Sequence, residues 1–184
     1  MARGLILAAR HPRPLVGSRI CYGRMDVALA EPAAVGAAAL IEAARMQDGG
    51  VPIERIISSP QSRALDVARA VAAETGAPLR TDDRLVELDF GAWEGQPWAT
   101  LPRAEIDAWA ADPLHYTPGG GECVMDVLRR VRHAWTGIAS AAETTLVLTH
   151  AGPIRCLLHI AQGVPLLQAI QAGIAYGSIT PLLP

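Results

Sequence analysis

The chain has 184 residues, 51% of them hydrophobic, and its 16 basic and 18 acidic residues leave a formal net charge of −2. This length suits one domain, and the apolar content suffices for a sizeable core. A nearly neutral charge argues against nucleic-acid partners and against binding to an anionic membrane. Any anion that the protein binds must therefore be held by a few local cations.

The chain opens with a predicted buried strand followed by a long loop. The apolar run 5–9 ends at Arg10 and His11, which is typical of a strand whose carboxyl end delivers polar residues. This run is too short for a membrane span or a secretory signal, so we expect a cytoplasmic protein. Residues 12–32 carry several prolines and glycines, and a loop of this length is usually functional.

Helices and strands are predicted to alternate from residue 33 onward. Ser59 and Pro60 are the expected N-cap and first turn of the second helix. Alternation of this kind favours a three-layer α/β/α sandwich around a mostly parallel central sheet. We interpret residues 1–184 as a single domain with a small insert at about 88–122. In chain order the predicted elements are a helix at 33–47, a strand at 55–58, a helix from about 60 to 75, a strand at 79–81, an irregular segment at 91–102, helices at 103–111 and 122–142, a strand at 145–149, a helix from about 151, and a final strand near 175–182.

Two histidines occupy matching positions, because His11 and His150 each follow a short apolar strand. The carboxyl ends of parallel strands meet at one edge of a sheet, so the two imidazoles are expected to face each other across one crevice. Arg63 lies in the first turns of the second helix, near the same edge. A guanidinium in that position can donate to two oxygens of a phosphate group. The pattern therefore indicates a site for a phosphate ester.

Four short motifs, taken together, resemble one known family. They are Arg10-His11, 58–64 (SSPQSRA), 85–95 (LVELDFGAWEG) and 149–152 (THAG). Their order and spacing resemble the histidine phosphatase superfamily, also called phosphoglycerate mutase-like, and the resemblance spans residues 5–160. It implies a phosphomonoesterase of the histidine acid phosphatase type that forms a phosphohistidine and passes the phosphoryl group to water.

The same resemblance implies a role for six residues. These are His11 as nucleophile, His150 as a second catalytic histidine, Glu87 as proton donor, and Arg10, Arg63 and Ala151 as phosphate-binding residues. The chemistry requires such residue types, because fixed cations must offset the charge of a phosphate monoester before attack. The three cysteines lack the spacing of a zinc site and the chain has no GxxxxGK loop. We therefore expect no metal and no cofactor.

Position 12 departs from the family, which usually has glycine directly after the nucleophile. Pro12 removes a backbone donor and fixes φ near −65°. Arg13 is a candidate to replace the lost phosphate contact. Pro12 also leaves open the alternative that the chain is a non-catalytic, regulatory module that binds phosphate esters without turning them over.

The segments 89–98, 107–109 and 118–122 are most similar to those of α-ribazole phosphatases. This similarity implies a small phosphorylated metabolite as substrate, with α-ribazole 5′-phosphate of cobalamin synthesis as the first candidate. A cofactor-dependent phosphoglycerate mutase is the alternative within the family, although such enzymes are longer. The sequence does not decide between a monomer and a homodimer.

The leaving group of the substrate requires its own contacts. Tyr22, Arg24, Trp93 and Trp98 are the predicted candidates, because aromatic faces and one cation suit a flat base and a ribose.

Overall fold

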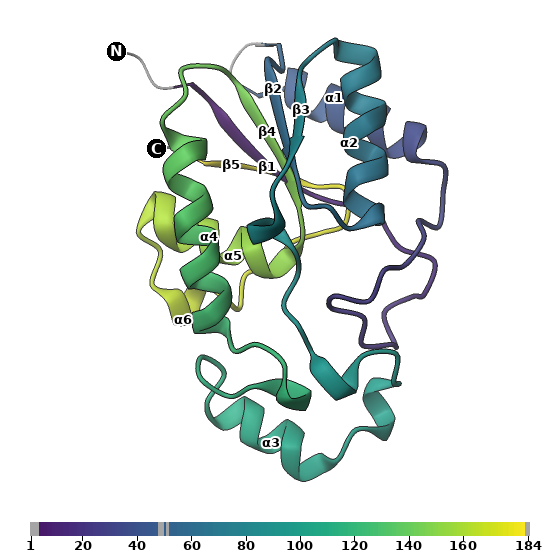
Figure 1. Cartoon of the computed structure of the whole chain (residues 1–184), viewed down its shortest axis with the longest axis vertical. Coiled ribbons are helices and arrows are strands. Elements are labelled where there is room, and N and C mark those ends of the chain that lie inside the picture. The colour runs from purple at the N-terminus through teal and green to yellow at the C-terminus, as the bar shows by residue number, and fades with distance from the viewer. Residues whose placement is uncertain (1–3, 48–49, 51, 183–184) are drawn as a thin grey trace.

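The computed structural model describes residues 4–47, 50 and 52–182. At its centre is a five-stranded sheet with the order β3–β2–β4–β1–β5 (Figure 1). Neighbouring strands are parallel except at the edge, where β5 runs antiparallel to β1. The predicted α/β fold with a mostly parallel sheet is therefore confirmed. The strands are β1 (Ile6–Arg10), β2 (Arg55–Ser58), β3 (Leu79–Thr81), β4 (Thr145–Thr149) and β5 (Ile179–Leu182), and the helices are α1 (Ala33–Arg45), α2 (Ser62–Thr75), α3 (Arg103–Ala111), α4 (Val124–Ala139), α5 (Ala151–Gln162) and α6 (Leu166–Ala169).

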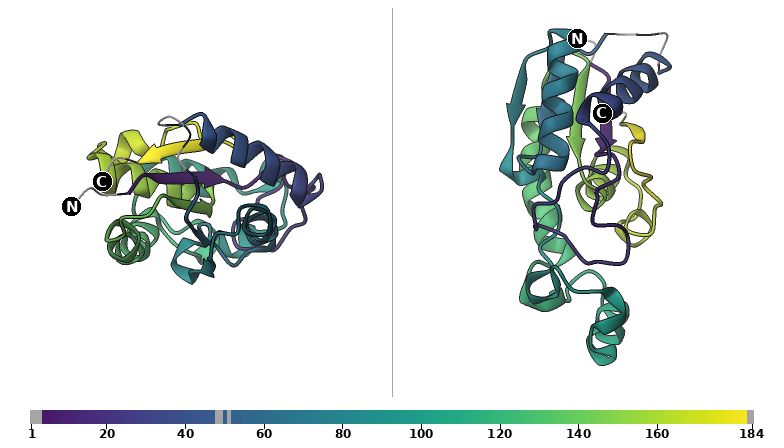
Figure 2. Two further views of the ribbon diagram at one scale, coloured as in Figure 1. Left: turned by 90° about the horizontal axis from the view of Figure 1, so that it is seen from above. Right: turned by 90° about the vertical axis from the view of Figure 1, so that its right-hand side faces the viewer.

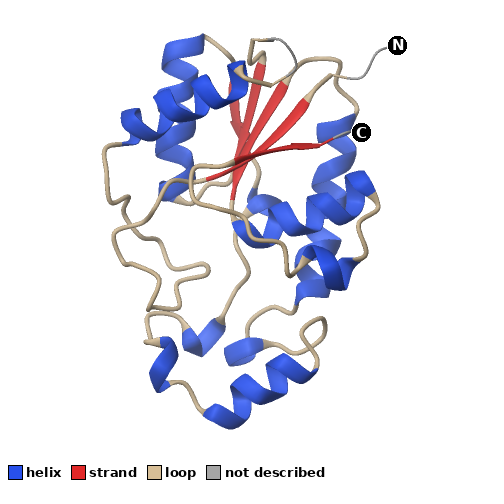
Figure 3. Ribbon diagram, turned by 180° about the vertical axis from the view of Figure 1, so that it is seen from behind, coloured by secondary structure: helices blue, strands red, loops and turns tan. Residues whose placement is uncertain are grey.

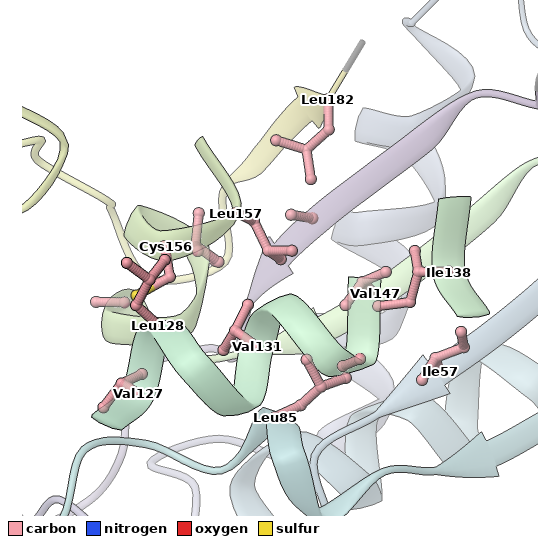
Figure 4. Packing of buried hydrophobic residues seen from close by; sticks show 14 of the residues in the cluster. Ile57, Leu85, Val127, Leu128, Val131, Ile138, Val147, Cys156, Leu157 and Leu182 are labelled. Carbon is pink, nitrogen blue, oxygen red and sulfur yellow. The ribbon is translucent and has the colours of Figure 1, made fainter. Parts of the chain in front are cut away.

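Helices cover both faces of the sheet (Figures 1 and 3). Leu7 of β1 packs in a buried cluster with α1 and α2, whereas its neighbour Ala8 packs in another with α4 and α5. Successive side chains of a strand point to opposite faces, so one strand serves both layers. Figure 4 shows the second cluster, in which Ile138 of α4 lies beside Val147 of β4. The three-layer sandwich thus follows from apolar strands that are buried on both sides.

Two helix starts differ from the prediction. The second helix begins at Ser62, with Gln61 at its N-cap and no side-chain cap. Ser59 lies too early to cap it. Its hydroxyl accepts from the Gln61 N–H at 3.4 Å and also hydrogen-bonds the His150 ring at 2.8 Å. Helix α4 is shorter than the predicted 122–142, because Cys123 and Asp126 form a capping box at its start. The short helix α6 was not predicted.

The segment between β3 and α4 extends beyond the carboxyl ends of the strands, and α3 lies at its far end (Figures 1 and 2). We call residues 88–122 the insert. It has an aromatic cluster of its own, in which Trp98 and Trp109 stack with ring centroids 6.2 Å apart. Its chain also packs closely on itself, since a Cβ on Gly119 would lie 2.1 Å from the Phe90 carbonyl oxygen.

Among the helices that the structure describes, none combines the length and apolarity needed to cross a membrane.

Candidate active site

The carboxyl ends of three adjacent strands bring four polar residues together. Arg10 and His11 leave β1, Ser59 leaves β2, and His150 leaves β4, which lies between them. The backbone N–H of His11 donates to the Thr149 carbonyl at 3.0 Å, which continues the β1–β4 pairing beyond the strands. As a result the His11 and His150 rings lie with centroids 5.0 Å apart. Both rings are buried.

His11 is held in one tautomer. Its Nδ1 lies 2.6 Å from the Pro12 carbonyl oxygen, which can only accept a hydrogen bond. Nδ1 therefore carries the proton, and Nε2 has a free electron pair that accepts from Arg63 Nε at 3.3 Å. Burial, followed by the charges of Arg63 and Arg10, lowers the pKa of His11 to about 3. The imidazole is thus neutral and nucleophilic at neutral pH.

Arg63 is fully buried at the second position of α2. Besides its contact with His11, it donates through NH1 to the Met25 carbonyl at 2.9 Å and through NH2 to the Gly23 carbonyl at 2.7 Å. These bonds join the long loop to His11. A guanidinium has five N–H donors, so two of them remain for a substrate.

Arg10 is positioned by the C-terminal segment. Its guanidinium carbon lies 3.7 Å from the centre of the Tyr176 ring, and NH1 donates to the Ile174 carbonyl at 2.6 Å. The Tyr176 hydroxyl hydrogen-bonds that of Tyr22, whose ring faces Arg63 at 5.2 Å. The hydrogen-bonded tyrosine pair therefore links the two arginines, because each ring faces one guanidinium. Sequence reasoning missed Tyr176, because no motif surrounds it and only the packing reveals it.

His150 is the N-cap residue of α5, and it is completely buried. Burial is the main cause, and Arg63 the second, of a pKa well below the ordinary value. Within the described part of the chain, His150 Nδ1 and Arg10 Nε are the two buried side-chain atoms without a hydrogen-bond partner. An unpaired buried donor or acceptor is costly, so these atoms suit the oxygens of a bound phosphate.

Glu87 meets the first turn of α5. Its Oε1 accepts from the Gly152 N–H at 3.0 Å and from the Leu88 N–H at 3.0 Å. Position 152 must be glycine for this contact, since a Cβ there would lie 2.3 Å from Glu87 Oε1. The Gln61 side chain accepts from the Glu87 N–H at 2.8 Å, and Arg130 donates to the Glu87 carbonyl at 3.0 Å. The carboxylate is thus fixed beside the helix start.

A cavity of about 240 Å³ opens beside these residues, and we call it the phosphate cavity. His11, Arg63 and His150 are buried and are not among its lining residues. Its lining brings together five predicted residues, which are Arg10, Tyr22, Glu87, Trp98 and Ala151. Its other lining residues, which the sequence did not suggest as site residues, include Tyr176 and Arg155. An arginine within a helix carries no recognisable signal by itself, and the role of Arg155 depends on what packs against it.

Three other candidates lie elsewhere. Arg13 is exposed and lines a separate cavity with residues 16–19 and Tyr176. Arg24 NH2 forms an ion pair with Glu122 at 2.9 Å. Trp93 is buried in the insert, where its Nε1 donates to Glu105 at 2.7 Å. The structure therefore does not bring Arg13, Arg24 and Trp93 into the phosphate cavity, and their contacts with a substrate stay predictions.

Pro12 packs against α1 at a helical glycine. A Cβ on Gly36 would lie 2.4 Å from Pro12 Cγ, so the glycine leaves the space that the proline ring fills. Although Pro12 lacks a backbone N–H donor, its carbonyl oxygen fixes the tautomer of His11. In the residues that the structure describes, there is no group of three or more His, Cys, Asp or Glu side chains arranged for a metal.

The sequence of this chain is similar to those of a known family and of several known proteins. Residues 6–183 match the family model of the Histidine phosphatase superfamily (branch 1). The Bifunctional protein Rv2228c of Mycobacterium tuberculosis is 42% identical over 132 residues, which cover 69% of this chain and 35% of that protein. The chain thus spans about a third of that relative. Glucosyl-3-phosphoglycerate phosphatase of the same species is 31% identical over 160 residues, or 77% of this chain and 67% of that protein.

Solved structures show the same architecture. The structure of Bacillus stearothermophilus YhfR superposes with a TM-score of 0.82 at 25% identity, covering 97% of this chain and 90% of the other. The α-ribazole phosphatase of Shigella flexneri gives a TM-score of 0.80 at 22% identity, covering 96% and 89%. The second likeness, at this low identity, concerns the fold alone.

Proposed function

This chain belongs to the histidine phosphatase superfamily, and we propose that it hydrolyses small phosphate monoesters through a phosphohistidine on His11. The observation that carries the proposal is the state of the His11 ring. Its proton is on Nδ1, its free electron pair is on Nε2, and Arg63 lies directly at Nε2. A buried neutral imidazole between two guanidiniums has the properties of a nucleophile for a dianionic ester.

In the first step, the Arg63 Nε–H hydrogen bond moves from His11 Nε2 to a phosphoryl oxygen. The freed electron pair of Nε2 attacks phosphorus and the ester P–O bond breaks. Arg10, Arg63 and His150 offset the charge of the phosphoryl oxygens, and the unpaired atoms on Arg10 and His150 support this assignment. The departing alkoxide takes a proton from Glu87. Because Oε1 accepts two backbone N–H bonds, that proton would sit on Oε2.

In the second step, water attacks the phosphohistidine. The Glu87 carboxylate takes a proton from this water, the N–P bond breaks, and inorganic phosphate leaves. His11 recovers its electron pair and Glu87 its proton, so the cycle closes without a further reactant.

Trapping the intermediate tests the proposal. The native protein and a His11→Asn variant are mixed with a ³²P-labelled monoester and quenched with alkali within milliseconds. We expect label on His11 in the native protein and none in the variant. A His115→Asn variant, which changes an exposed histidine, is the matched control and should be labelled normally. Tight phosphate binding without label would instead support a non-catalytic phosphate-binding module.

The substrate is a second part of the proposal. A small phosphorylated metabolite fits the phosphate cavity, and α-ribazole 5′-phosphate is the candidate that the insert motifs favour. A panel should include this ester, glucosyl-3-phosphoglycerate and 3-phosphoglycerate. Release of free phosphate would support hydrolysis, whereas isomerised phosphoglycerate would indicate a mutase. A separate light-scattering measurement of the molar mass in solution would establish whether the protein is a monomer or a homodimer.

A further inference from the structure

A second cavity adjoins the phosphate cavity. Its volume is about 420 Å³, within the range of roughly 300–1,000 Å³ that is usual for small-molecule sites. Both cavities are lined by Glu87, Phe90 and Arg155. The two cavities therefore meet at these side chains. His11 itself lines neither cavity, but Tyr176, whose ring lies 5.6 Å from that of His11, lines the phosphate cavity. An ester bound beside His11 would extend toward the second cavity past Glu87.

The second cavity is mainly apolar, and its walls come from distant parts of the chain. Trp109 of α3 lies on the insert side, Val124 and Val127 belong to α4, and Ile170 follows α6. Its two charged lining residues among the described part of the chain, Glu87 and Arg155, are shared with the phosphate cavity. Polarity thus decreases with distance from the phosphate.

Arg155 lies at the junction of the two cavities. Its Nε donates to the Ala172 carbonyl at 3.0 Å, which fixes the guanidinium between the C-terminal segment and Glu87. Burial lowers the pKa of Arg155, and the Glu87 carboxylate opposes this change. The remaining N–H donors suit an oxygen acceptor of the substrate close to the phosphate, before the apolar part begins.

From this arrangement we infer that the second cavity, which we call the ring cavity, binds an apolar ring system carried by the leaving alcohol. This inference rests on the proposed function, because it concerns the ester whose phosphate His11 attacks. The selected substrates are esters with a short polar linker and a fused aromatic ring. Alcohols that are hydroxylated throughout would leave the apolar walls without a matching partner.

A pair of primary-alcohol esters tests the inference. Ethyl phosphate and 2-(1-naphthyl)ethyl phosphate release alcohols of similar acidity, so their intrinsic reactivity is matched. We expect kcat/KM to be roughly 10- to 100-fold higher for the naphthyl ester, since burial of a group of this size contributes a factor of that order. The ratio of the two kcat/KM values is the measured quantity.

Two variants fill the ring cavity from opposite walls. Ala110→Trp narrows it from α3, and Val124→Phe narrows it from α4. Both should reduce the ratio of the two kcat/KM values toward one. Ala108→Trp is the matched control, because Ala108 is exposed on the same helix and lines neither cavity. It should keep the native ratio.

The outcomes separate this inference from the proposed function. If neither ester is hydrolysed and no phosphohistidine forms, the proposed function fails and the inference fails with it. If ethyl phosphate is hydrolysed but the native ratio is near one, only the inference is overturned. A high ratio that both cavity-filling variants leave unchanged also overturns it, because the ring would then bind elsewhere.

Discussion

The two ends of the candidate site are built in different ways. The phosphate end consists of Arg10, His11, Arg63 and His150, which lie at the ends of strands or the starts of helices. Arg63 hydrogen-bonds His11, and the other two are held by neighbouring segments. The ring end is assembled from the insert, α4 and the segment after α6. In the proposed mechanism, the strand ends provide the groups that break the ester bond, whereas the peripheral segments determine the shape of the cavity for the alcohol. In this arrangement one fold can keep its chemistry while the bound alcohol changes.

The division has a measurable consequence. Changes at the phosphate end should lower the rate for every ester by a similar factor. Changes at the ring end should instead alter the order in which esters are preferred.

The largest expected effect concerns the proton affinity of His11. Its pKa of about 3, compared with an ordinary 6.5, means that the ring stays neutral at pH 5. Since the pKa is lower in the folded protein than in the unfolded chain, acidification below about 6.5 favours unfolding, increasingly down to about 3. ¹⁵N NMR of the imidazole nitrogens should report the neutral Nδ1–H form at pH 5. Titration near 6.5 would contradict the buried nucleophile.

Replacement of Arg63 should give the largest loss of activity. Arg63→Lys keeps the charge but loses the planar fork that bonds His11, Gly23 and Met25. We expect kcat/KM to fall by about 10²–10³ for all esters alike. Arg69→Lys, at an exposed position of the same helix, should have no effect. A loss of kcat/KM that depends strongly on the alcohol would contradict the assignment of Arg63 to the phosphate end alone.

Glu87 lies at that boundary, so its replacement should depend on the acidity of the leaving group. Glu87→Gln should lower kcat/KM for ethyl phosphate by about 10². For p-nitrophenyl phosphate the loss should be only a few-fold, because that phenolate leaves without a proton. Steady-state kinetics with both esters provide the check, and Glu74→Gln, at an exposed position, is the control. Equal losses would exclude Glu87 as the proton donor.

An intermediate effect is expected where Pro12 meets α1. Gly36→Ala places a Cβ 2.4 Å from Pro12 Cγ and so displaces the carbonyl that holds His11. We expect kcat/KM to fall by about tenfold for every ester, although alanine favours the helix by about 1 kcal/mol. Gly137→Ala is the matched helical control, since its nearest neighbour would be 3.7 Å away. Recovery of activity in Pro12→Gly/Gly36→Ala would establish the contact as the cause.

The smallest effect should come from Arg24. Its ion pair with Glu122 is partly exposed, and pairs of this kind contribute at most about 1 kcal/mol. Arg24→Met should therefore reduce kcat/KM only a few-fold, equally for ethyl and naphthylethyl phosphate, and less at high salt. A loss confined to the larger ester would show that Arg24 contacts the leaving group, as the sequence suggested.

The sequence predicted the sheet and the placement of the phosphate end because the signals there are local. An apolar strand followed by a polar residue identifies both the element and the edge at which it ends, as at His11 and His150. Parallel pairing then brings these residues together without further information. The same local reasoning misplaced Ser59, since its hydroxyl has two possible partners and the tertiary fold provides the His150 ring.

The ring end and the C-terminal residue that supports Arg10 could not be predicted in this way. Tyr176 and Arg155 acquire their positions from contacts with residues far away in the chain, and neither lies in a pattern with its own period. Trp93 was an expected substrate contact because of its residue type. In the fold it is buried in the insert, while Trp109 lines the ring cavity instead. Which tryptophan faces a cavity depends on how the insert packs.

The C-terminal segment also determines when the site can exist. The Gly177 N–H donates to the carbonyls of Arg10 and His11, and β5 pairs with β1. A ribosome synthesises Gly177 later than His11, by an interval on the order of ten seconds at about 5–20 residues per second. Throughout that interval the nascent chain contains His11 without the contacts of Gly177 and β5. Under the proposed function, we expect reactivity toward phosphate esters only after this segment has been synthesised and has paired with β1.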